Sequence, residues 1–135
     1  MRYITLITAI VLSAACASSA NTYNPEEMAD LASQLKDISA AVDGTLKFSS
    51  EPYTDPQKLL LTAIRGDKSR LTPFKNYQLK VVIQEQDAAL LLCQDKRLLI
   101  EDVGCTAKSD IQHWQSSTPL TCEATVTFSQ LCASH

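Results

Sequence analysis

Cysteine placement constrains the fold of this chain more than any other feature of its sequence. Cys16 stands alone near the N-terminus, whereas Cys93, Cys105, Cys122 and Cys132 lie in the last third. Four cysteines in an exported chain are typical of two disulfides, because disulfides form and persist in oxidising compartments. The sequence has no Cys-x-x-Cys pair, which disfavours a zinc site. We therefore expect two disulfides, no bound metal and no other cofactor.

The connectivity of these cysteines stays open between two pairings. Cys93 should lie opposite Leu98 in a hairpin, and Cys105 follows Leu98 by seven residues, about 23 Å if the chain is extended. Bridged Cα atoms lie within roughly 7 Å of each other. Cys93–Cys105 with Cys122–Cys132 would therefore require the chain to double back, and this favours Cys105–Cys122 with Cys93–Cys132.

Residues 1–15 have the pattern of a signal peptide. Arg2 is the only charged residue before Glu26, and residues 3–15 form an apolar run that narrows to alanine and serine. This order of charge, apolar run and small residues is typical of exported chains. The run is shorter than the roughly 20 residues of a membrane span. We expect residues 16–23 to form a tether and residues 24–135 to fold as one domain.

The end of this segment, Leu12-Ser13-Ala14-Ala15-Cys16, resembles the lipobox of bacterial envelope lipoproteins. In that family, small residues precede a cysteine that receives diacylglycerol and becomes the mature N-terminus. Ser13 stands where the strongest form of the motif has leucine. Ala17, rather than aspartate, follows the cysteine, and the resemblance then implies the outer membrane. The alternative is ordinary cleavage after Ala17 or Ala20, which would give a soluble periplasmic or secreted protein.

Hydrophobic periodicity predicts one α+β domain, with two helices packed on an antiparallel sheet of four or five strands. The first helix is expected to begin after Asn24, its N-cap, and to end at Gly44. Residues 45–48 are expected to form a short strand, and a second helix is expected between Asp55 and Gly66. The apolar stripe of the first helix comprises Met28, Leu31, Ala32, Leu35, Ile38 and Val42.

The strands are expected in the second half of the chain. Residues 77–84 alternate apolar and polar side chains, as a half-buried strand does. Residues 88–93 are continuously apolar, which is typical of a central strand covered on both faces. After a turn, residues 98–100 are expected to pair back. Alternation over residues 122–128 predicts a last strand.

Charge and motifs exclude several function classes. The net charge of −3 disfavours nucleic-acid binding, and no nucleophile elbow or phosphate-binding loop is present. Asp110 and His113 are a titratable pair at helical spacing, so the carboxylate could orient the imidazole. The simpler interpretation is that Asp110 caps a turn and His113 is solvated.

Glu101 and Asp102 should point to opposite faces of a strand, and we expect them to end that strand.

Trp114 is the only tryptophan and lies in a polar stretch, residues 106–121, that we expect to be a loop between two cysteines. Tryptophan can cover a small core, or it can anchor a binding surface. We expect the core role for Trp114. In the alternative, Asp110, His113 and Trp114 belong to a recognition loop carried by a rigid scaffold.

Together these patterns predict a non-enzymatic envelope protein, anchored by a lipid at Cys16 on the periplasmic side of the outer membrane. We expect it to bind a protein partner as an accessory factor or an immunity-type inhibitor, without nucleic acid and with the membrane contacted only through the lipid. Two alternatives remain: a small periplasmic hydrolase that uses Asp110 and His113, or a secreted toxin.

Overall fold

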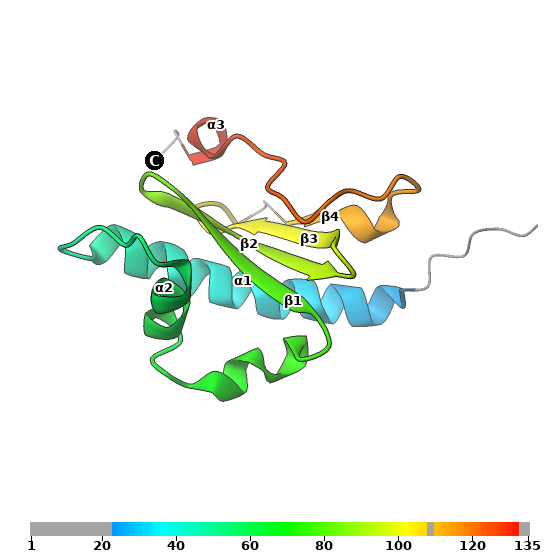
Figure 1. Cartoon of the computed structure of the whole chain (residues 1–135), viewed down its shortest axis with the longest axis horizontal. Helices are drawn as coiled ribbons and strands as arrows, with labels where there is room; N and C mark the ends of the chain where they lie inside the picture. The colour runs from blue at the N-terminus through cyan, green and yellow to red at the C-terminus, as the bar shows by residue number, and fades with distance from the viewer. Residues whose placement is uncertain (1–22, 108–109, 133–135) are drawn as a thin grey trace, which may run out of the picture.

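One four-stranded antiparallel sheet, with the strand order β1-β2-β3-β4, organises the fold (Figure 1). The computed structural model describes residues 23–107 and 110–132. The α+β class and the four-stranded antiparallel sheet are confirmed. In chain order the elements are α1 (Pro25–Phe48), α2 (Pro56–Ala63), the 3-10 helix η1 (Lys68–Phe74), β1 (Gln78–Gln84), β2 (Asp87–Gln94), β3 (Arg97–Val103), β4 (Ile111–Gln112), the 3-10 helix η2 (His113–Gln115) and α3 (Phe128–Cys132).

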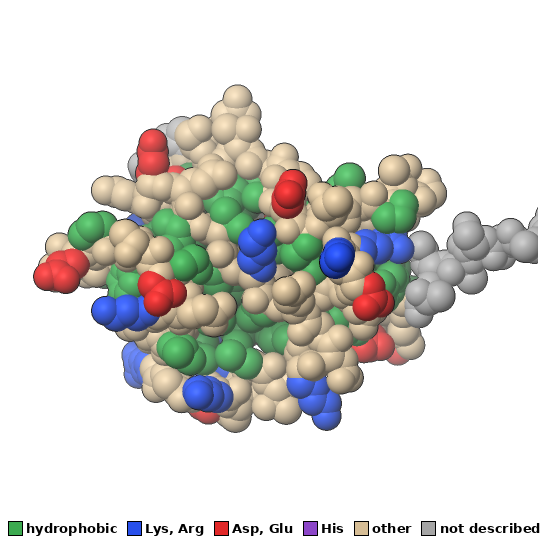
Figure 2. Space-filling view, in the orientation of Figure 1, with side chains coloured by type: hydrophobic (Ala, Val, Ile, Leu, Met, Phe, Trp, Pro, Cys, Tyr) green, Lys and Arg blue, Asp and Glu red, His purple; other side chains and the backbone are tan. Residues whose placement is uncertain are grey.

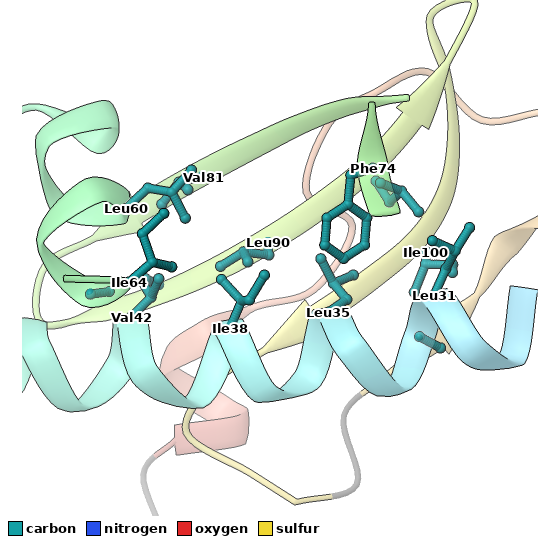
Figure 3. Close-up of a cluster of buried hydrophobic side chains, with 14 of the residues drawn as sticks. Leu31, Leu35, Ile38, Val42, Leu60, Ile64, Phe74, Val81, Leu90 and Ile100 are labelled. Carbon is teal, nitrogen blue, oxygen red and sulfur yellow. The ribbon is translucent and has the colours of Figure 1, made fainter. Parts of the chain in front are cut away.

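Helix α1 begins where the Asn24 side chain accepts hydrogen bonds from the backbone N–H groups of Glu26, at 2.8 Å, and Glu27. Its apolar stripe points into the core beneath the sheet, where it meets side chains of β2, β3 and η1 (Figure 3). The labelled residues of this contact are Leu31, Leu35, Ile38 and Val42 of α1, with Leu90, Ile100 and Phe74. Among the residues that the structure describes, no helix has both the length and the hydrophobicity needed to cross a membrane.

The short strand predicted at residues 45–48 is wrong, because α1 continues to Phe48. Leu46 lies one helical turn after Val42 and is buried on the same stripe, so burial favours another turn of helix. The Thr45 hydroxyl donates to the Ala41 carbonyl at 2.7 Å, which is compatible with the helix. Gly44 therefore sits inside α1 instead of ending it.

Strand β2 is buried on both faces, as its continuous apolar sequence predicts. Ala88, Leu90 and Leu92 face the core formed with α1 and α2. Ala89, Leu91 and Cys93 face the other side, where residues 120–132, which we name the C-terminal segment, cover the sheet (Figure 1). The fold thus has three layers: helices, sheet and an irregular cover.

The last strand predicted at residues 122–128 is wrong. Burial does alternate along these residues, since Cys122, Ala124 and Val126 are half-buried and Phe128 is buried. The residues nevertheless form no strand, and near them only Thr121 makes an isolated bridge, to Arg97. The segment crosses the face of the sheet instead of extending its edge. The alternation therefore arises because every second side chain points toward the sheet, and not because the segment pairs with a neighbouring strand.

Both disulfide pairings considered above are wrong, because the structure joins Cys93 to Cys122 and Cys105 to Cys132. The Cα atoms are 5.9 Å and 5.7 Å apart, respectively. The chain returns beside the β2–β3 turn, where the Cys122 N–H donates to the Lys96 carbonyl at 3.0 Å, and this places Cys122 over Cys93. It then crosses the sheet face to α3, which meets Cys105 just beyond the end of β3.

Candidate functional site

Glu101 and Asp102 lie inside β3 and are fully buried, so the expectation that they end the strand is wrong. The register between β2 and β3 shifts after Leu98, where Leu98 pairs with Cys93 but Ile100 pairs with Leu92. Beyond this bulge the two acids point to opposite faces, as neighbouring strand residues do. Glu101 faces the C-terminal segment, and Asp102 faces α1.

The Glu101 carboxylate binds two separate parts of the chain. Its Oε2 accepts the Thr125 backbone N–H at 2.8 Å, and its Oε1 accepts the Thr125 hydroxyl at 2.5 Å. His113 Nε2 lies 2.9 Å from the same Oε1. Because a buried charge is costly unless it is paired and hydrogen-bonded, these contacts explain how β3 tolerates a glutamate. The carboxylate also supplies Thr125 with the hydrogen-bond partner that a neighbouring strand would have provided.

His113 is not the solvated residue that the simpler interpretation predicts. Its side chain is only 11% exposed, and its partner is Glu101. Asp110 is separated from it by the strand residues of β4, so the two do not share a helical turn. Within the described part of the chain, the structure brings His113 to Glu101 and Thr125, not to Asp110.

A carboxylate that orients an imidazole is one part of a nucleophilic triad, and the rest must be a nucleophile within reach of the imidazole. Thr125 is the hydroxyl beside this pair, but it donates to the Glu101 carboxylate. Its proton is therefore directed to the acid and away from the imidazole. The geometry of these three residues is that of a polar cluster that fastens β3, η2 and the C-terminal segment together.

Asp102 forms a second buried contact, on the opposite face. Lys36 Nζ lies 2.9 Å from Asp102 Oδ2 and forms an ion pair with it. The Ser39 hydroxyl donates to the Asp102 carbonyl at 3.3 Å. A cavity of about 290 Å³ opens beside this pair, with Gly104 and Thr106 in its wall. The Lys36–Asp102 ion pair and the hydrogen bond from Ser39 fasten β3 to α1.

Trp114 is buried, with 5% of its surface exposed, and belongs to the core on the helix side of the sheet, as the core interpretation predicts. Its indole N–H donates to Gln112 Oε1 at 3.1 Å. Arg97 donates to the carbonyls of Trp114, at 3.3 Å, and Ser116, at 3.1 Å. The polar stretch expected to be a loop thus divides into a packed part and an exposed run, residues 115–121.

Asp87, Cys105 and Cys132 bring possible metal-ligating atoms within 4.8 Å of one another. Both sulfurs belong to a disulfide, whereas metals bind the free thiolate. In the oxidised protein, this cluster offers only one carboxylate.

Thr125 and the role of Glu101 were not predicted from the sequence. One signal was available: Glu101 and Asp102 directly follow the apolar residues Leu98, Leu99 and Ile100. A charged residue inside a buried strand needs a partner that neutralises it or forms hydrogen bonds with it. A charged residue in an apolar run therefore predicts a contact with a distant part of the chain.

Comparisons of the chain with models of protein families, with curated proteins and with solved structures found no match.

Proposed function

We propose that this chain is an exported, non-enzymatic lipoprotein of the bacterial envelope that binds a protein partner. The proposal rests on the roles of the five cysteines. Four of the five form two disulfides within the folded domain, and the fifth, Cys16, follows a run of small residues that resembles a lipobox. An oxidising compartment and a lipidated Cys16 account for all five.

The position of the disulfides supports an extracytoplasmic location. Both attach the C-terminal segment, at Cys122 and at Cys132, to the strand layer. This segment has few backbone hydrogen bonds to the sheet, so its attachment relies on the covalent links, on the buried Phe128 and on the Glu101 contact with Thr125. A reducing compartment would remove the two covalent links.

For the binding surface we propose the exposed run of residues 115–121, in an accessory or immunity-type inhibitor role. Arg97 fixes the start of this run through two carbonyl groups, and Leu120 is 37% exposed. Loops held on a rigid scaffold commonly carry recognition. His113 and Trp114 would then position the run, and Asp110 would lie at its flank.

Fractionation with intact-mass analysis tests the export part of the proposal. We expect the mature protein in the outer-membrane fraction, beginning at Cys16, with a diacylglyceryl thioether and no free thiol. Cys16→Ser is the control, and it should lose both the lipid and the membrane association. A mature chain that keeps Met1 would contradict export. An unlipidated chain released from the cell would favour the secreted toxin instead.

Two matched leucines test the binding surface. Leu120 in the exposed run and Leu131 in α3 have nearly equal exposure, 37% and 38%. We expect Leu120→Arg to lose an envelope protein that copurifies with the unaltered chain, and Leu131→Arg to keep it. Equal retention by both variants would exclude this run as the docking surface.

A further inference from the structure

Strand β1 leaves one edge of the sheet open. It is the terminal strand of the sheet and pairs only with β2, and it runs across the front of the molecule in Figure 1. Along the described part of the chain, no other strand pairs with its outer side. In an antiparallel strand, every second residue directs its N–H and C=O groups outward. The edge therefore presents main-chain donors and acceptors along all of β1.

Natural proteins usually protect such edges with proline, bulges, short length or an edge lysine. Strand β1 has seven residues, contains no proline or glycine, and pairs with β2 in one continuous register. Its only charged residue is Lys80, whose ammonium group donates to the Cys122 carbonyl at 3.4 Å. That contact holds the charge over one face of the sheet, so β1 has no proline and no bulge, and this one lysine is its only protection.

Apolar surface accompanies the open edge. Leu79 and Ile83 are only half-buried although they point toward the core. Figure 2 shows hydrophobic side chains across the middle of this face, over β1 and toward α2. A strand added at this edge would cover apolar surface as well as satisfy main-chain groups.

We infer that the occupant of this edge is a second copy of the chain, paired antiparallel through β1 about a two-fold axis at Val81. The sequence of β1, Gln-Leu-Lys-Val-Val-Ile-Gln, is close to a palindrome in polarity. With the axis at Val81, Gln78 lies opposite Gln84 of the other copy, Leu79 opposite Ile83, and Lys80 opposite Val82. Amide meets amide at the ends of the strand, Leu79 meets Ile83, each lysine faces a valine, and no like charges face each other.

Other registers fit less well. An axis between two residues would place core-facing side chains opposite outward-facing ones, because side chains alternate with a period of two. An axis at Lys80 would set the two lysines directly opposite each other, which is unfavourable. An axis at Val82 would leave Gln78 and Leu79 outside the paired strand. Only the axis at Val81 pairs all of β1, and it gives an isologous dimer with one continuous sheet.

This inference does not depend on the proposed function, and two measurements on the full chain test it. Sedimentation of the unaltered protein at micromolar concentration should give the mass of a dimer. In addition, Leu79→Cys and Ile83→Cys variants, mixed and then oxidised, should form a disulfide-linked dimer, since opposed Cα atoms are about 5 Å apart. Neither variant alone should crosslink, because like residues lie about 13 Å apart in this register.

A pair of lysine variants tests the register by charge. Val82→Lys should abolish the dimer, because it sets Lys80 opposite a second lysine, whereas Gln84→Lys on the same face should leave the dimer intact. A monomer at every concentration would overturn the inference, as would a dimer in which the mixed cysteine variants do not crosslink. A different protein that adds a strand at β1 while the chain alone stays monomeric would also overturn it.

Discussion

Glu101 illustrates what one buried carboxylate can contribute to a small fold. It lies on β3 with no exposed surface, and it binds the backbone and hydroxyl of Thr125 and the imidazole of His113. Removing it would leave the partly buried donors of Thr125 and His113 without their acceptor, which costs more than the loss of a fully exposed hydrogen bond.

We expect Glu101→Ala to lower the free energy of unfolding by about 3–5 kcal/mol, as is usual when one member of a buried charged network is removed. Glu101→Gln, which keeps one acceptor oxygen, should cost less. Glu123→Ala, at an exposed position, is the control and should be near neutral. Urea denaturation measures all three, and a Glu101→Ala variant as stable as the control would contradict the role of the cluster.

Tyr77 makes the stability of the fold depend on pH. Its hydroxyl donates to Glu27 Oε1 at 2.8 Å, and burial together with this hydrogen bond raises the pKa of Tyr77 to about 12. An unfolded tyrosine has a pKa near 10. The contribution of Tyr77 to stability is therefore fully present below about pH 10 and is lost as the pH rises toward 12.

An ultraviolet titration of the folded protein should consequently show one tyrosine that ionises later than an ordinary tyrosine. In Tyr77→Phe this last step should be missing, while the earlier steps stay unchanged. If the late step persists in that variant, the assignment to Tyr77 is wrong.

At the scale of elements, features that depend on neighbouring residues could be predicted from the sequence. Features that depend on contacts between distant residues could not. Capping at Asn24, the alternation of β1 and the apolar run of β2 could be interpreted from neighbouring residues alone, because they depend on local geometry. The extension of α1 to Phe48 could not, since it depends on the burial of Leu46 against distant residues. The bulge in β3 and the path of residues 122–128 likewise result from packing between segments far apart in the sequence.

Two glycines give a matched test of element packing. A Cβ added to Gly104 would lie 2.4 Å from the Ser39 carbonyl oxygen, which is helix backbone, whereas one added to Gly44 would have no atom within 4 Å. We expect Gly104→Ala to destabilise the fold by about 1–3 kcal/mol through overpacking between β3 and α1.

Gly44→Ala should instead stabilise the fold by about 0.5–1 kcal/mol, because alanine favours a helix interior over glycine. The two thermal midpoints should thus move in opposite directions. A shift in the same direction for both variants would contradict the close approach at Gly104.

At the scale of the whole molecule, the C-terminal segment completes the core. It covers Ala89, Leu91 and Val103, which would otherwise form an apolar face in contact with water. The sequence predicted the two disulfides but not their pairing, because the argument from distances along the chain assumed that the segment would join the sheet as a strand.

Removal of single disulfides should measure how firmly this cover is attached. The bridges span 29 and 27 residues, and loops of this length are worth about 3–4 kcal/mol each in the chain-entropy account. Cys93 is fully buried, while Cys105 and Cys132 are half-buried.

We therefore expect the double change Cys93→Ala with Cys122→Ala to cost more than Cys105→Ala with Cys132→Ala, and both to increase binding of a hydrophobic dye. Denaturation in urea, without reductant, gives the comparison. Equal costs, or no increase in dye binding, would indicate that the segment stays in place without its bridges.

The bridges are interleaved: among the four cysteines of the folded domain, the first joins the third and the second joins the fourth. This order has a consequence for how an exported chain matures. A chain that emerges from a translocation channel N-terminus first exposes Cys93 and Cys105 to oxidants before either native partner has arrived. A bond formed at that stage would be non-native, and thiol–disulfide exchange would have to break it before the fold can close. If the chain is exported as proposed, its maturation should depend on a disulfide isomerase as well as an oxidase, and cells without the isomerase should accumulate chains linked Cys93 to Cys105.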